Sequence, residues 1–435
     1  MSPQPVSPRG KAHATAEHLA RRSFGKLVAF LAARSGDVAA AEDALADAFA
    51  AALADWPRNG APDNPEAWLM TVAKRRLIDA ARRRQTSAEA AGYLTLMAQE
   101  LDDVQEAEIP DQRLALMFAC AHPAIDQSVR APLILQTVLG FDAATIASAF
   151  LVSPATMAQR LVRAKTKIKE AGIPFRVPER SDLPERLDAV LAAIYASFGE
   201  GWSDPAGTET RRRNLAEEGI WLGRLVVSLM PKEPEALGLL ALMLHAEARR
   251  GARRDASGEY VPLAEQDPAA WDDALIDEAE ALLTRASAIA LSGEVDAGSP
   301  QDNATKINAI GRYQLEAAVQ SAHVARRRTG ATDWAAIAQL YAALYEMTHS
   351  PVVAINRAVA TAETRGPAAG LAALDEIAID GRLVEYQPYW AARAGLLARQ
   401  GDVAEADLAY QRAIGLEPDP AVRRFLERRR AELRD

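Results

Sequence analysis

Hydrophobic residues recur at helical spacing along most of the chain. Over residues 36–57 they fall on one face of a helix that begins after Gly36 and ends at Pro57. A second helix is predicted over residues 65–84, with Pro65 in its first turn. Because the alternation typical of half-buried strands is scarce, the pattern predicts an all-α fold. The apolar face of the first helix comprises Val38, Ala41, Leu45, Ala48, Phe49 and Leu53.

Residues 113–172 carry a second group of predicted helices. One helix ends near Gly140, and a short helix runs over residues 142–150. After a tight turn, Ser153 caps a third helix that has Pro154 at its first position. This order of helix, short turn and helix is the helix-turn-helix pattern of many DNA-binding domains.

The third helix of this group is strongly basic. Residues 150–169 read FLVSPATMAQRLVRAKTKIK, with five bases and no acid. The spacing places bases on one face and apolar residues on another, which suits a helix that packs on one side and meets phosphates and base edges on the other. A solvated basic helix without a ligand is the alternative. The candidate DNA-binding residues are Thr156, Gln159, Arg160, Arg163 and Lys167, and the apolar residues are Met157, Leu161, Ala164 and Ile168.

A second basic cluster ends the helix predicted over residues 65–84. Trp68 precedes it by one to two turns. Bases beside an aromatic ring suit single-stranded or melting DNA, because an unstacked base needs a ring surface and the backbone needs cations. The alternative is a core role for Trp68 and a solvated helix end. The cluster comprises Lys74, Arg75, Arg76, Arg82, Arg83 and Arg84.

Residues 185–435 read as a run of helices separated by Pro and Gly. Over residues 389–420 the spacing of large, small and turn residues matches a tetratricopeptide (TPR) repeat. One repeat cannot bury its own apolar face, so several helix pairs are expected to stack from residue 185 onward. The polar stretch 292–308 is predicted to be an exposed loop. The repeat positions are Trp390, Gly401, Ala406, Tyr410, Ala413 and Pro418.

Charge divides the chain into unlike parts. The net charge is +2 over residues 1–180 and −11 over residues 181–435. Residues 86–112 contain acids but no Lys or Arg, so they are predicted to form an acidic linker. The proline-rich stretch 173–184 is predicted to be a second linker, and residues 1–14 a disordered lead.

Composition argues against several classes of function. With Cys120 as the single cysteine, no disulfide framework or cysteine-based metal site is expected, which fits a reducing cytoplasm. The six histidines are scattered, and the isolated glycines form no phosphate-binding loop. No apolar run is long enough for a membrane span. We therefore expect no enzyme activity, no metal, no cofactor and no membrane partner.

The quoted residues resemble a bacterial RNA polymerase sigma factor of the extracytoplasmic-function (group IV) class. NPEAWLMTVAKRRLIDAARRR is similar to text of sigma domain 2, and IASAFLVSPATMAQRLVRAKTKIKEAGIPFRVP to text of domain 4. LGLLALMLHAEARRGAR and SPVVAINRAVA look like the C-terminal TPR-like extension of one subgroup. The resemblance covers nearly the whole chain. It implies domain 2 over residues 15–85, domain 4 over residues 113–172 and a TPR-like helical regulatory domain over residues 185–435.

The resemblance also implies partners and roles. Core RNA polymerase would bind through its β′ clamp and β flap, and promoter DNA would be recognised and melted. The TPR-like domain would modulate this activity in cis and could receive a regulatory protein or peptide. Glu42, Asp43, Asp47 and Phe49 would contact the β′ clamp; Trp68, Lys74, Arg75, Arg76, Arg82, Arg83 and Arg84 would hold the −10 element open, with Asn64 in the loop that accepts a flipped base; Thr156, Gln159, Arg160 and Arg163 would read the −35 element.

Two other interpretations account for parts of the sequence. A conventional helix-turn-helix repressor or activator would bind duplex DNA without polymerase, as a dimer on a palindromic site. It would leave the cluster at 74–84 and the acidic helix without a purpose. A TPR adaptor would bind a peptide and play no part in transcription, which does not explain the basic face at 160–169.

Overall fold

The computed structural model describes residues 38–84, 111–170, 178–202, 210–295 and 310–434, together with scattered positions between 15 and 35. The predicted lead at 1–14, most of the acidic linker and the first part of the second linker lie outside these residues. Within them every regular element is helical, so the predicted all-α fold is confirmed. None of the described helices has the length and apolar character needed to cross a membrane.

The chain divides into two compact units. Unit 1 spans residues 1–197 and unit 2 spans residues 198–435. The boundary falls inside a helix, later than the linker that the sequence predicts at 173–184. The helices of unit 1 are α2 (Val38–Asn59), α3 (Pro65–Arg84), α5 (Gln112–Cys120), α6 (Gln127–Thr137), α7 (Ala143–Ala149) and α8 (Pro154–Glu170), followed by the 3-10 turn η1 (Arg180–Asp182) and by α9 (Leu183–Trp202), which crosses the boundary.

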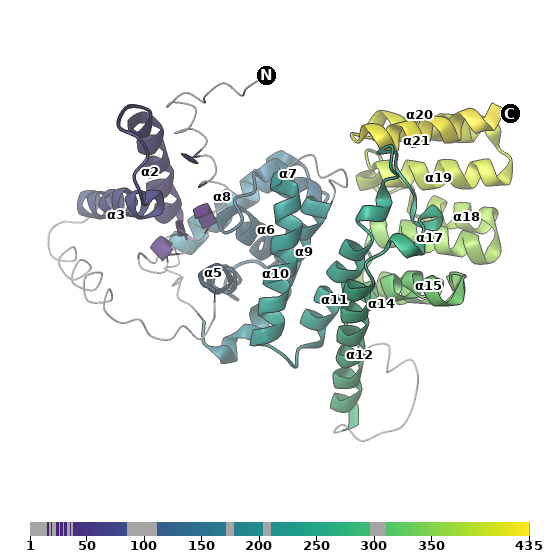
Figure 1. Ribbon diagram of the computed structural model, residues 1–435, viewed down its shortest axis with the longest axis horizontal. Coiled ribbons are helices and arrows are strands. Elements are labelled where there is room, and N and C mark those ends of the chain that lie inside the picture. Colours follow the sequence, from purple (N-terminus) through teal and green to yellow (C-terminus); the bar gives the residue numbers. More distant parts are fainter. Residues whose placement is uncertain are drawn as a thin grey trace. The chain divides into compact units, whose positions relative to one another are not determined.

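In unit 1, α2 and α3 lie side by side (Figure 1), and apolar side chains fill the contact between them. Leu45, Trp56 and Leu69 are fully buried there. The predicted end of α2 at Pro57 is wrong, because the helix continues to Asn59. A proline removes one helical hydrogen bond and crowds the carbonyl four residues earlier, but here only two further residues continue the helix. Gly60 ends the helix instead, with φ 84° and its N–H bonded to Trp56 O at 2.9 Å.

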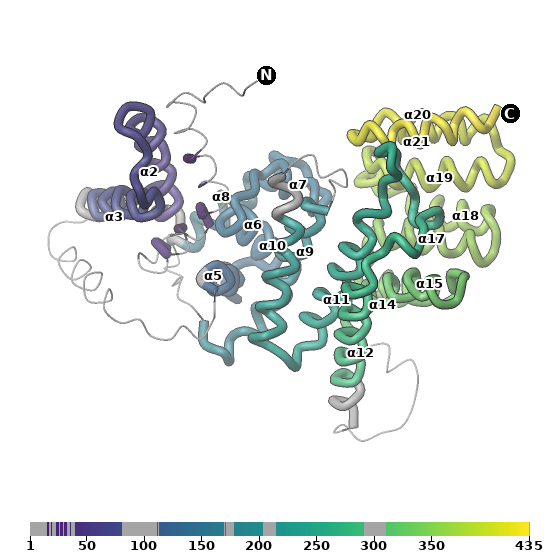
Figure 2. The backbone as a smooth tube through the Cα atoms, viewed as in Figure 1, coloured from purple at the N-terminus to yellow at the C-terminus, as the bar shows by residue number. Residues whose placement is uncertain are grey.

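Unit 2 is a succession of packed helices. Figure 2 shows the chain passing from α11 and α12 into the stack that includes α17–α20, and from α16 to α21 each helix packs on the next in sequence. The helices are α10 (Thr210–Leu229), α11 (Pro234–Ala248), α12 (Asp273–Val295), α14 (Arg312–Val324), α15 (Arg326–Thr329), α16 (Trp334–Thr348), α17 (Pro351–Arg365), α18 (Pro367–Ile377), α19 (Gln387–Gln400), α20 (Val403–Leu416) and α21 (Pro420–Ala431). Short 3-10 turns are η2 (Gly251–Arg253), η3 (Leu263–Glu265), η4 (Pro268–Ala270), η5 (Gly381–Leu383) and η6 (Glu432–Arg434).

The central helix of unit 2 is α11, which is buried on nearly every side. It packs closely on α14, because a Cβ at Gly238 would lie 2.6 Å from the backbone nitrogen of Gln314. The carboxylate of Glu235 accepts hydrogen bonds from the N–H groups of Tyr313 and Gln314 at 3.0 and 3.2 Å. Glu235 therefore caps α14 from a neighbouring helix, which fixes the start of α14 against the start of α11.

The helix pair of α19 and α20 has the local features that the TPR spacing predicts. Gly401 ends α19 in the left-handed region, at φ 87°. Ala406 and Ala413 are fully buried where the two helices touch, and Tyr410 is buried beside them. The predicted loop at 292–308 is wrong for its first four residues, which belong to α12, and residues 296–309 lie outside the described part of the chain.

A loop that follows α11 reaches forward to α21. Arg254 and Tyr260 form an isolated antiparallel bridge in this loop. The ring of Tyr260 meets that of Phe425 edge to face, with 5.4 Å between centroids. We call residues 254–260 the clasp loop, since its contacts join positions 165 residues apart. Its ion pairs are Glu259 with Arg424 and with Arg428, each at 2.7 Å, and Arg254 with Asp419.

Candidate nucleic-acid and polymerase interface

The turn before α8 is built by local capping. Asp142 accepts hydrogen bonds from the N–H groups of Ala144 and Thr145 and so begins α7. Leu151 has a φ of 51°, which lets the chain reverse within the turn. The hydroxyl of Ser153 accepts a hydrogen bond from Thr156 N at 3.2 Å, so the predicted cap of α8 is confirmed.

The two faces of α8 separate as predicted. Met157, Leu161 and Ile168 are buried. The candidate DNA-binding side chains lie outside, and among the described residues none of the three basic ones forms an ion pair. A cationic surface is therefore open to phosphates. The exposed candidates are Thr156, Gln159, Arg160, Arg163 and Lys167.

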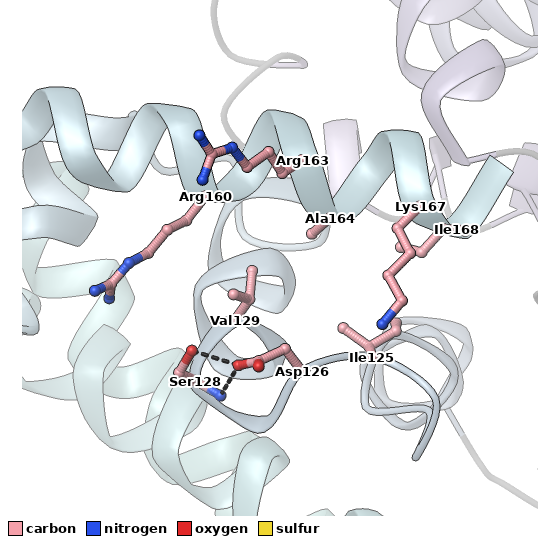
Figure 3. A pocket seen from close by; sticks show the side chains of 9 residues that line it. All are labelled: Ile125, Asp126, Ser128, Val129, Arg160, Arg163, Ala164, Lys167 and Ile168. Atoms are coloured by element: carbon pink, nitrogen blue, oxygen red, sulfur yellow. Dashed lines mark hydrogen bonds between the residues drawn. The ribbon is translucent and has the colours of Figure 1, made fainter. Parts of the chain in front are cut away.

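A pocket of about 270 Å³ lies between α8 and the start of α6 (Figure 3). Its apolar lining includes Ile125, Val129 and Ile168, while the stems of Arg160 and Lys167 border it. At its edge the side chain and backbone of Ser128 donate hydrogen bonds to Asp126, and these lower the pKa of that carboxyl. The site is an apolar hollow with a mainly cationic rim, which suits an apolar side chain flanked by acids.

The candidate polymerase-binding residues of α2 occupy different faces. Asp43 and Asp47 are exposed. Phe49 is half-buried against Phe24, with 6.1 Å between ring centroids. The carboxylate of Glu42 is also half-buried, and its Oε2 lies 2.6 Å from Nζ of Lys165 on α8. The structure therefore does not bring the four residues onto one open surface.

Leu53 of α2 is exposed, although helical spacing predicts it on the apolar core face. The residue is 44% exposed. Ala46 and Ala50 are also exposed, and with Asp43 and Asp47 they follow one side of the helix at helical spacing. The result is a stripe with acids at one end and Leu53 at the other. A helical repeat of about 3.6 residues places position 53 near the border of the core face. At that border, periodicity does not predict whether a side chain is buried or exposed.

The residues of α3 combine packing with exposure. Trp68 is half-buried and meets the buried ring of Trp56 edge to face at 5.5 Å. The side chain of Asn64 accepts a hydrogen bond from Ala67 N at 3.1 Å, so it caps α3 in this state. Lys74 lies over the ring of Phe30, 5.3 Å from its centroid. Arg75 and Arg76 are exposed; Arg82, Arg83 and Arg84 lie in α3, but their side chains lie outside the described part of the structure.

Cys120 belongs to the core of unit 1. It is fully buried, and burial raises the pKa of its thiol well above the usual range. Such a thiol is inert as a nucleophile. Within the described ranges, no three His, Cys, Asp or Glu side chains come together as metal ligands would.

Comparison with known proteins finds matches to both parts of the chain. Residues 19–87, which include α2 and α3, match the family model Sigma-70 region 2. Residues 186–287 match DUF6596, a family of unknown function. An uncharacterized protein of Rhizobium meliloti (strain 1021) is 39% identical over 385 residues, which cover 86% of each protein. The chain belongs to the family of this Rhizobium protein. No solved structure matches it.

This chain thus combines a match to sigma-70 region 2 with a match to DUF6596. The sigma-70 region supports a sigma-factor-like role in transcription initiation, with binding to core RNA polymerase and promoter DNA. Sigma factors are not an enzyme family. In this chain the match to DUF6596 begins within α9 and ends within α12, so it includes the buried helix α11 and the clasp loop.

Proposed function

We propose that the protein is a sigma factor of the extracytoplasmic-function class that binds core RNA polymerase, melts promoters and is modulated in cis by unit 2. One observation carries the proposal. The chain that carries sigma-70 region 2 also presents, on α8, a cationic face free of ion pairs to other described residues, behind a capped turn. Promoter melting needs a surface that binds single-stranded DNA, and duplex recognition needs a helix that fits the major groove. The sigma-70 region 2 segment would provide the first and α8 the second.

In this proposal α8 enters the major groove of the −35 element. Gln159 and Arg160 lie near its N-terminal end, where base edges are within reach, and Arg163 and Lys167 follow along phosphates. Arg75, Arg76 and the half-buried ring of Trp68 engage the −10 element. Asn64 would release Ala67 N when a flipped base enters its loop.

Polymerase would meet unit 1 at the exposed stripe of Asp43, Asp47 and Leu53, which offers acids and one apolar residue to the β′ clamp. The resemblance also implies a contact with the β flap. The pocket between α6 and α8 is not assigned to that contact, because Arg160, Arg163 and Lys167, which line it, face the −35 element in this proposal.

Run-off transcription on genomic fragments, with core polymerase and the full chain, tests the proposal. We expect initiation at defined positions, and loss of at least tenfold in Arg160→Ala/Arg163→Ala and in Asp43→Asn/Asp47→Asn. Asp79→Asn, which removes an exposed acid of α3, is the control and should initiate normally. Duplex binding to a palindromic site without initiation would instead favour a conventional repressor or activator.

A further inference from the structure

Arg249, at the end of α11, is a buried cation without a carboxylate partner. The residue is 6% exposed. Its Nε donates to the carbonyl oxygen of His245 at 3.2 Å, and its Nη2 donates to the side-chain oxygen of Gln320. Its Nη1 has no hydrogen-bond partner among the described residues. Burial lowers the pKa of the guanidinium to about 10, so Arg249 remains charged at neutral pH.

Further cations lie close to Arg249 rather than the anions that would offset it. Arg253 and Arg326 both lower its pKa by their charge. Arg253 lies over the ring of Trp202 at 3.8 Å, and Arg326 donates to three backbone carbonyls, two in η3 and one at the residue after it. Both guanidinium groups are therefore held by neutral groups. Buried charges are normally paired, so this concentration of positive charge calls for an anion.

Two neutral polar side chains, on α14 and α16, interact electrostatically with the same guanidinium. Tyr341, on α16, has its pKa raised to about 12 by burial and then by the charge of Glu316, which is paired with Arg312, so its hydroxyl keeps its proton. His323, on α14 beside Trp334, has its pKa lowered to about 4, mainly by burial and then by Arg249 and Arg326. Neither side chain forms a hydrogen bond with the described residues. Helices α11, α14 and α16 thus each contribute a polar group that can form at least one further hydrogen bond.

Helix capping explains only part of this arrangement. An arginine near the C-terminus of a helix often donates to the last carbonyls, as Nε of Arg249 does to His245. Capping does not account for the unpartnered Nη1, for the additional cations or for the unbonded Tyr341 hydroxyl.

We propose that Arg249, His323 and Tyr341 form a site in unit 2 for a small anion that carries a carboxylate or phosphate group. A guanidinium matches either group with two parallel hydrogen bonds, and the hydroxyl and imidazole N–H add donors. Figure 1 shows α11 and α14 adjacent within unit 2, and an anion bound there would join them to α16. An anion bound at this site would be an effector of unit 2. This proposal goes beyond the role in transcription, and anion binding can be measured without polymerase.

Thermal unfolding of the full chain tests the site. Sodium phosphate and sodium succinate are titrated separately against sodium chloride at equal ionic strength, because screening of surface charge affects all three alike. We expect a saturable rise of about 2–4 °C in the midpoint of unit 2 with one of the two anions beyond the effect of chloride. The anion that succeeds distinguishes a phosphate ligand from a carboxylate ligand.

Three variants make the result specific. Arg249→Gln should abolish the rise. Tyr341→Phe removes a hydroxyl without a protein partner, so it should keep the unliganded midpoint while raising the anion concentration for half-effect at least fivefold. Arg365→Gln, which removes an exposed cation of α17, should respond like the unaltered chain. The proposal is wrong if neither anion exceeds chloride, or if Arg249→Gln and Tyr341→Phe both respond normally.

Discussion

Lys165 differs from its neighbours on α8 because it points to α2 rather than to solvent. Arg163 and Lys167 are exposed, whereas Lys165 and Glu42 keep only 23% and 18% of their side chains exposed. In the unbound chain, Lys165 of the predicted recognition helix is therefore paired with Glu42, which the resemblance assigns to the contact with polymerase. If polymerase binds Glu42, it competes with Lys165.

Removal of Lys165 should cost more than removal of an exposed lysine. Lys165→Met leaves the half-buried Glu42 carboxylate unpaired, and we expect a loss of about 1–2 kcal/mol in the free energy of unfolding. Lys167→Met is the matched control, with an expected change within about 0.5 kcal/mol. Urea unfolding of both variants measures the difference, and equal values would show that the pair contributes nothing.

His245 should make unit 2 sensitive to acid. It is fully buried, and burial followed by the charges of Arg249 and Arg327 lowers its pKa to about 3, although Glu280 lies 3.4 Å from its Nε2. Below pH 6.5 the ring of His245 binds a proton in the unfolded chain but stays neutral in the folded chain. Stability therefore falls with falling pH, by about 1.4 kcal/mol per unit between pH 6.5 and 3.

The measurement compares the chain with His245→Leu between pH 7 and pH 5. The unaltered unit should lose about 2 kcal/mol more over this interval than the variant. A pH profile that is the same in both would mean that Glu280 stabilises a protonated ring after all.

At the scale of elements, sequence periodicity predicts where helices lie better than it predicts where they begin and end. The cap at Ser153 and the end of α19 at Gly401 follow from local chemistry, so they were predictable. The exposure of Leu53 depends on which neighbour covers α2, so spacing alone does not predict it; the end of α2 is set by Gly60 rather than by Pro57. Glu42 and Lys165 are far apart in the sequence, as are Arg249 and the polar groups around it. The hydrophobic pattern and residue spacing therefore do not predict these contacts.

The docking of α21 on the clasp loop is an element-scale feature that mutation tests directly. Phe425→Ala removes the ring that packs edge to face on Tyr260, and we expect unit 2 to lose about 2–3 kcal/mol. Glu427→Ala, at an exposed position of the same helix, should have little effect. Hydrogen exchange should show faster exchange in α21 for Phe425→Ala alone. Unchanged exchange would mean that α20 holds α21 without the loop.

At the scale of the whole molecule, two hydrophobic cores predict two unfolding transitions. Leu69 is fully buried in unit 1 and Leu237 in unit 2. Each Leu→Ala change should cost about 3 kcal/mol and lower the midpoint of its own transition by about 6–12 °C. Calorimetry of the full chain measures both. A shift of both transitions by either change would show that the two cores unfold as one.

The clasp loop also limits how this protein family can change length. An open array of repeats gains or loses a helix pair without harm, because each pair contacts only its neighbours. In unit 2 an added or deleted pair would carry Phe425, Arg424 and Arg428 away from Tyr260 and Glu259. Repeat number is thus fixed by a contact outside the repeats, and natural variation in this region should appear as longer or shorter loops, with the count of helices unchanged.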